Sequence, residues 1–149
     1  MSTPAKDKTR IGDHEIWFEP DTGFVFFVHN GVINLADAHG LVAYLINESA
    51  GEPIFFLANS RNATGFTPEA RKVLATSELI PVGVSVSSYG APLVIRVVVT
   101  LLEKATAVVP GAKVVAYATS EETAARAWLT ERRQAYLRRK SSGWSEPQR

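Results

Sequence analysis

The chain has 149 residues, of which 46% are hydrophobic and 21% are charged, and its formal net charge is +1. This composition is typical of a soluble globular domain, and the length suits one domain with a substantial core. The small net charge argues against a general nucleic-acid binder, and the absence of cysteine excludes disulfides, thiolate metal sites and cysteine nucleophiles.

The two ends of the chain are polar. The first ten residues, MSTPAKDKTR, lack the apolar run of a signal peptide, and no segment reaches the roughly 18 uninterrupted apolar residues of a membrane span. We therefore expect a cytoplasmic protein with a disordered tail over residues 1–11, one folded domain over 12–139 and a second disordered tail over 140–149.

The first part of the domain predicts a β-hairpin followed by a helix. His14–Glu19 and Phe24–His29 are rich in aromatic and β-branched residues, and the turn residues Pro20–Gly23 separate them. Asn34 is placed to cap the following helix, which ends near Gly51, where glycine suits a left-handed terminus.

The next stretch predicts a buried strand, a polar loop and a second helix. Ile54–Ala58 has the composition of the strand, and Asn59–Gly65 that of the loop. Thr67 is the expected N-cap of the second helix, with Pro68 at its first position, where the missing N–H costs nothing.

Two further strand–helix units complete the domain. Strands are expected over 81–87 and 112–118, with a helix over 91–105 between them and a last helix that opens with a capping box formed by Thr119 and Glu122. This order predicts a single α/β domain: a mixed, mostly parallel five-stranded sheet with about four helices on its faces.

The segment from Asn59 to Arg71 is the first candidate site. It follows the carboxyl end of a predicted strand and leads into a helix, which is where open α/β sheets place their binding sites. Its hydroxyl, amide and guanidinium groups are candidates for binding a partner or, for the hydroxyls, for accepting a phosphate: Asn59, Ser60, Arg61, Thr64, Thr67 and Arg71.

Several motifs in order resemble those of the SpoIIAA-like, or STAS-like, bacterial proteins. They are NSRN at 59–62, FTPEAR at 66–71, the apolar helix that contains Arg96, and YATSEETAARAWL at 117–129. The resemblance implies an α/β regulatory domain that docks protein partners, and in such regulators a serine or threonine of this loop is phosphorylated. By position Thr67 is the nearest match to that residue, with Ser60 and Thr64 in the same loop; a plain helix cap is the alternative role for Thr67.

The helix over 91–105 is the second candidate site. Its apolar residues cover more than the single face that one sheet buries: among them are Val94, Val97, Val98, Leu101 and Leu102. They predict a deeply covered core helix, a homodimer face or the lining of an apolar ligand pocket. The orientation of Arg96 discriminates, because an inward arginine requires a ligand head group or a buried partner.

No pattern of catalytic residues is present. The three histidines (14, 29 and 39) lack metal-ligand spacing, and the chain has neither a phosphate-binding loop nor a nucleophile elbow. We therefore expect no enzymatic activity, no metal, no cofactor and no membrane contact. The leading hypothesis is a regulatory protein-interaction domain, and the alternative is a carrier or sensor of a small apolar or lipid-like ligand held between the sheet and the 91–105 helix.

Overall fold

The computed structural model describes residues 8–76, 83–108 and 114–142. Over these residues the chain forms one sheet of six strands, together with four helices. The elements in chain order are β1 (Thr9–Ile11), β2 (His14–Glu19), β3 (Phe24–Ile33), α1 (Leu35–Ser49), β4 (Ile54–Phe66), α2 (Pro68–Ala75), β5 (Val84–Tyr89), α3 (Leu93–Ala107), β6 (Val114–Thr119) and α4 (Glu122–Ser141).

The strands lie in the sheet in their sequence order, β1-β2-β3-β4-β5-β6. The first three strands are antiparallel, and β3 to β6 are parallel. The predicted α/β class with a mixed, mostly parallel sheet is confirmed, although five strands were expected. The additional strand is β1, which pairs with β2 and includes residues 9–11 that we had assigned to a disordered tail.

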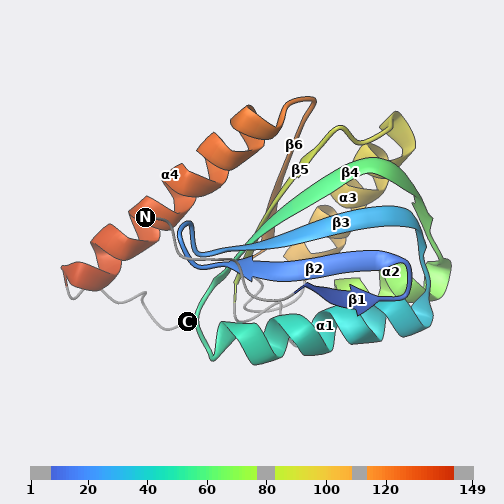
Figure 1. Ribbon diagram of the computed structural model, residues 1–149, viewed down its shortest axis with the longest axis horizontal. Helices are drawn as coiled ribbons and strands as arrows, with labels where there is room; N and C mark the ends of the chain where they lie inside the picture. The colour runs from blue at the N-terminus through green and yellow to red at the C-terminus, as the bar shows by residue number, and fades with distance from the viewer. Residues whose placement is uncertain (1–7, 77–82, 109–113, 143–149) are drawn as a thin grey trace.

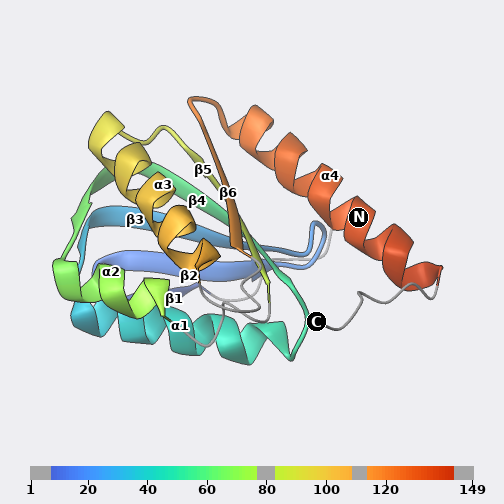
Figure 2. The same ribbon diagram turned by 180° about the vertical axis from the view of Figure 1, so that it is seen from behind.

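The helices cover the two faces of the sheet unequally. Helices α1, α2 and α3 lie on one face, and α4 lies alone on the other (Figures 1 and 2). We call these the three-helix face and the α4 face. Because side chains alternate along a strand, neighbours such as Phe26 and Phe27 enter different cores, with Phe27 on the three-helix face and Phe26 on the α4 face.

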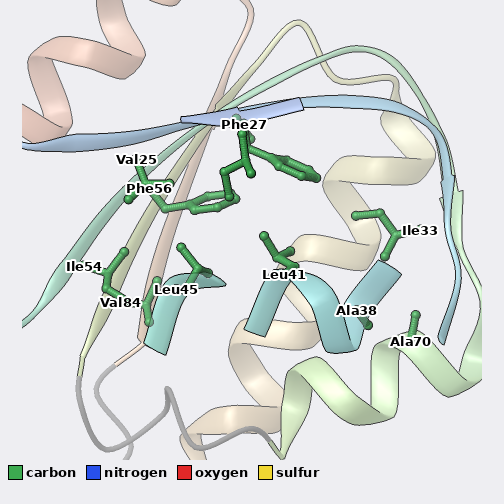
Figure 3. Close-up of a cluster of buried hydrophobic side chains, with 12 residues drawn as sticks. Val25, Phe27, Ile33, Ala38, Leu41, Leu45, Ile54, Phe56, Ala70 and Val84 are labelled. Atoms are coloured by element: carbon green, nitrogen blue, oxygen red, sulfur yellow. The ribbon is translucent and has the colours of Figure 1, made fainter. Parts of the chain in front are cut away.

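The core of the three-helix face lies between the sheet and α1. Figure 3 shows Phe27 and Phe56 directed from the sheet toward Leu41 and Leu45 of α1. The predicted cap of this helix is present: Asn34 Oδ1 accepts a hydrogen bond from the Asp37 backbone N–H at 2.8 Å, and Asp37 Oδ2 accepts one from the Asn34 N–H at 3.1 Å. This capping box fixes the start of α1 after β3.

The core of the α4 face is held by apolar packing and by polar bonds to α4. Phe55, Leu57 and Tyr89 pack against Ala125 and Leu129, all of them at most 7% exposed. At the hairpin end, Arg126 donates two hydrogen bonds to the Glu19 carboxylate, at 3.0 and 3.1 Å.

Two predicted boundaries on described residues are wrong. Thr119 and Glu122 do not form the start of α4, because its N-cap is Glu121, which makes no side-chain capping bond. The last helix also extends to Ser141, beyond the predicted domain end at 139. The expected strand starts at 81 and 112, most of the N-terminal tail (1–7) and most of the C-terminal tail (143–149) fall outside the described residues.

The largest difference between the predicted and the observed secondary structure is at residues 59–65, which were predicted to form a loop. These residues continue β4 to Phe66, because β3 also continues to Ile33 and supplies a parallel partner. Strand β5 ends at Tyr89, opposite Asn59, so the rest of β4 has a strand on one side only. An edge of this kind is compatible with the polar sequence that we had interpreted as a loop.

Candidate functional site

A cavity of about 150 Å³ lies between the sheet and the helices of the three-helix face. Strands β3 to β6 form its floor, and α1, α2 and α3 contribute to its walls. Most of the side chains that line it are apolar, among them Phe27, Ile33, Leu41, Leu45, Phe56, Ala58, Phe66, Leu74, Val84, Val86, Ile95, Val99, Leu102, Val114 and Ala116.

The cavity exists because the two layers do not fill the space between them. Three of the inward positions on β4 and β5 carry small side chains: Ala58 and Ser60 on β4 and Ser88 on β5. The positions nearer the amino ends carry larger ones, such as Phe56 and Val84. Small side chains under a helix leave a void that larger residues would close.

Three polar side chains line the cavity from neighbouring strands, two or more residues beyond the large inward residues Phe27, Phe56 and Val86. They are His29 of β3, Ser60 of β4 and Ser88 of β5, with exposed fractions of 3%, 2% and 2%. Ser88 is in register with Ala58, and Ser60 is two residues further along β4 on the same face. We call this group the polar end of the cavity.

The His29 ring is held by other rings. It makes edge contacts with His14 and Phe66, with centroids 5.3 and 5.1 Å apart, and its Nε2 atom has no hydrogen-bond partner among the described residues. Burial, helped by the neighbouring His14, lowers the pKa of His29 from 6.5 to about 4, against smaller opposite effects of backbone hydrogen bonds to Gly65 and Gly31. His29 is therefore neutral near pH 7.

His14 differs from His29 because both of its nitrogens are engaged. Its Nδ1 accepts a hydrogen bond from the Asn30 N–H at 3.0 Å. Its Nε2 lies 3.2 Å from the Val32 carbonyl oxygen and 3.3 Å from Asp37 Oδ2. The Nε2 proton therefore points to these acceptors, and His14 is a structural residue that joins β2 to α1.

The serines of β5 also differ in hydrogen bonding, and the difference follows the face of the sheet on which each one lies. On the α4 face, Ser87 Oγ donates to the Ala125 carbonyl at 3.1 Å, and Ser85 Oγ accepts from Arg132 Nε at 2.8 Å. On the cavity side, Ser88 Oγ has no hydrogen-bond partner among the described residues. The polar end of the cavity thus holds two buried polar atoms that have no partner in residues 8–76, 83–108 and 114–142, which is uncommon in folded proteins.

The residues predicted in the 59–71 segment do not form a single site. Because 59–66 is a strand, its side chains alternate: Ser60 lines the cavity, whereas Arg61 is exposed on the other face, with its guanidinium 5.1 Å from the centre of the Tyr89 ring. Asn59 accepts a local hydrogen bond from the Arg61 N–H at 3.2 Å. Gly90, at φ +72°, leaves room for Arg61, because a Cβ there would collide with it.

The remaining residues of that segment lie on the surface or cap α2. Thr67 is the N-cap, and its Oγ1 accepts a hydrogen bond from the Ala70 N–H at 3.1 Å, as the simpler sequence interpretation predicted. Thr64 and Arg71 are exposed. Of the three hydroxyls predicted as phosphoacceptors, Ser60 is buried, Thr67 is engaged as a cap and Thr64 is the accessible one.

The apolar residues predicted on α3 also divide between two environments. Leu102 lines the cavity and Val98 is half-buried, whereas Val94, Val97 and Leu101 are 57%, 49% and 56% exposed.

The polar side chains of the same helix lie mainly at its surface: Arg96, Thr100 and Lys104 are exposed, and Glu103 is half-buried. Arg96 is exposed and so supplies no head-group contact in the cavity; by our own sequence criterion this orientation indicates a helix docked on the sheet. Glu103 instead lies at the cavity wall, where its Oε2 accepts a hydrogen bond from the Ala116 N–H of the edge strand at 2.6 Å.

Sequence reasoning missed His29 and Ser88 as site residues. Strand periodicity could have found both, because His29 shares a face with Phe27, and Ser88 shares one with Val84 and Val86. A polar residue at an inward position of a buried strand is informative, because its buried polar group needs a hydrogen-bond partner.

No group of three or more histidine, aspartate or glutamate side chains among the described residues is arranged to hold a metal ion. None of the helices formed by residues 8–76, 83–108 and 114–142 is long and apolar enough to cross a membrane.

No protein-family model and no curated protein matches the chain. The structure is similar to the crystal structure of an uncharacterized protein from the DUF3478 family with a SpoIIAA-like fold, from Shewanella loihica PV-4. The two chains share 16% sequence identity, the match covers 87% of this chain and 98% of that one, and the TM-score is 0.48.

Proposed function

We propose that this protein binds a small apolar molecule in the cavity between the sheet and α3, without catalysing a reaction. The cavity itself carries the proposal: a void of about 150 Å³ with mostly apolar walls lies where the alternative sequence hypothesis placed a ligand. An apolar cavity of about this volume accepts a molecule the size of benzene.

The test is a titration of the whole chain with benzene, followed by NMR of methyl-labelled leucine and valine. The signals of Val99 and Leu102, which line the cavity, are expected to shift in a saturable manner. Those of Leu57 and Leu129, which are fully buried on the α4 face, are the internal control and are expected to stay unchanged. Equal shifts on both faces, or none, would contradict the proposal.

A filled-cavity variant gives an independent test. Ala58→Leu adds three carbon atoms at the cavity floor, where Ala58 is 6% exposed. We expect it to abolish the saturable shifts of Val99 and Leu102 and to keep the melting temperature at or above that of the wild type, because the new side chain fills a void. Saturable binding that survives in the folded variant would place the benzene site elsewhere.

A regulatory protein-interaction domain is the second candidate, and the outer side of α3 favours it. Leu93, Val94, Val97 and Leu101 are between 49% and 68% exposed on this one helix. Exposed apolar patches frequently mark interaction surfaces. The partner that we propose is a second copy of the chain.

Sedimentation velocity over a range of concentrations tests the second candidate. Leu101→Lys is expected to abolish self-association, whereas the control Thr100→Lys, at an exposed position of the same helix, is expected to retain it. A wild-type chain that sediments as a monomer at every concentration would contradict it.

If the chain is phosphorylated, we expect the phosphate on Thr64, because its side chain is exposed whereas that of Ser60 is buried. Mass spectrometry that maps the phosphate to Ser60 would contradict this expectation.

A further inference from the structure

The polar side chains of the cavity restrict which chemical groups a ligand can carry. His29, Ser60 and Ser88 are at most 3% exposed and line a mainly apolar cavity from the neighbouring strands β3, β4 and β5. Glu103 and Thr106 of α3 also line it, but Glu103 Oε2 accepts from the Ala116 N–H and Thr106 Oγ1 donates to the Glu103 carbonyl. The buried polar atoms of the lining that have no hydrogen-bond partner among the described residues are on His29 and Ser88. This inference rests on the proposed function, since it describes the occupant of the same cavity.

Two atoms at the polar end are available to a ligand. His29 Nε2 and Ser88 Oγ have no hydrogen-bond partner within the described part of the chain. A buried polar group without a hydrogen bond is energetically unfavourable, so a ligand that pairs with either atom recovers part of that cost. The serines on the opposite side of β5 already have such partners, in Ala125 and Arg132.

The tautomer of His29 determines what the ligand must supply. Nε2 has no hydrogen-bond partner among the described residues, so the backbone groups of Gly65 and Gly31 that favour the protonated ring act on Nδ1, and we assign the proton of the neutral ring to Nδ1. Nε2 is then a lone-pair acceptor. A hydroxyl group donates to such an acceptor and can also pair with the Ser88 hydroxyl, whereas a ketone or an ether has no proton to donate.

The electrostatics of the cavity disfavour an anionic ligand. The carboxylate at its wall, Glu103, is engaged with the Ala116 N–H, and His29 carries no charge near pH 7 because burial holds its pKa at about 4. The exposed Arg96 does not line the cavity. An anion would therefore be buried without a cation, which is far more costly than burying a neutral hydroxyl.

We propose that the cavity takes a neutral hydroxyl compound about the size of benzene, such as phenol, whose hydroxyl donates to His29 Nε2 and pairs with Ser88 Oγ while its carbon atoms fill the apolar part.

The experiment compares phenol with toluene, which has the same number of non-hydrogen atoms but no hydroxyl. Both are titrated at pH 7 against the wild type, Ser88→Ala and His29→Phe, with the methyl signals of Val99 and Leu102 as the readout. The measured quantity is the ratio of the toluene Kd to the phenol Kd. We expect each variant to lower that ratio about tenfold, the value of one hydrogen bond of about 1.4 kcal/mol.

Phenol and toluene differ in their free energy of hydration, but that difference is the same for every variant. It therefore cancels when the Kd ratios of two variants are compared. Ser88→Ala keeps the shape of the site and serves if His29→Phe does not fold. A ratio that is the same in wild type and Ser88→Ala would overturn the proposal while leaving the binding function intact, provided that toluene binds. If neither phenol nor toluene binds, the proposed function itself fails.

Discussion

The two faces of the sheet are built from the same strands but differ in how completely they are packed. On the α4 face, large side chains such as Leu57 and Tyr89 fill the core, and the β5 serines there are hydrogen-bonded to α4. On the three-helix face, the corresponding carboxyl-terminal positions carry Ala58 and Ser88, and a cavity remains. The comparison teaches that three helices can leave more space than one when the strand residues beneath them are small.

The largest expected difference between the faces is in the response to truncation. Leu57→Ala removes a fully buried side chain from the α4 face and should lower the free energy of unfolding by about 3 to 4 kcal/mol. Leu102→Ala on the cavity wall should cost about 1 kcal/mol, because this half-buried side chain borders an existing void and has fewer contacts to lose. Urea unfolding measures both, and equal losses would show that the faces are packed alike.

The second expected difference is a dependence of stability on pH that arises on the three-helix face. The pKa of His29 is lowered from 6.5 to about 4, so between these values the unfolded state binds a proton that the native state does not. The free energy of unfolding should therefore fall as the pH drops from 6.5 to 4, by about 3 kcal/mol from this group. The charged or titratable groups around it are His14 on β2, Asp37 on α1 and Glu103 at the cavity wall.

His29→Gln isolates that contribution. The variant keeps a polar side chain at the same position but cannot titrate, so the difference in stability between wild type and variant should change with pH only over this window. Urea unfolding at a series of pH values gives that difference. If the difference in free energy of unfolding between wild type and variant is constant from pH 4 to pH 7, His29 has an ordinary pKa and is not buried away from water.

The smallest expected difference compares two adjacent serines on opposite faces. Ser87→Ala removes a buried hydrogen bond to the Ala125 carbonyl and should cost about 1 kcal/mol. Ser88→Ala removes a hydroxyl that has no partner within the described residues and should leave stability unchanged or slightly raised. Thermal unfolding of the two variants, made in the same background, checks this; a comparable loss in Ser88→Ala would show that its hydroxyl is already satisfied.

Local sequence patterns predicted most elements of the fold. The hairpin of β2 and β3, the Asn34 cap of α1 and the Thr67 cap of α2 all follow from interactions between residues close together in the chain. The predicted start of α4 was wrong because Thr119 belongs to β6, where it pairs with Tyr89. Pairing with a distant strand outweighed a capping pattern that was present in the sequence.

The candidate site was predicted only in part. A pocket between the sheet and the 91–105 helix was one of three alternatives that the sequence left open, and Leu102, which was named for it, lines the cavity. Ser60 also lines it, although it was named for the other candidate site. The sequence did not reveal His29 or Ser88. The residues that it grouped between 59 and 71 are separated, because strand alternation sends Ser60 and Arg61 to opposite faces.

The sequence by itself determined the order of strands and helices and the two-residue alternation that assigns each strand side chain to a face. These features depend on short-range sterics and on hydrogen bonds between near neighbours. Tertiary structure decided the extension of β4, which required β3 as a partner, and the presence of the cavity. A cavity is the difference between the space that packed layers enclose and the volume of the side chains within it, so it depends on β3, β5 and α3 together and cannot be read from any one of them.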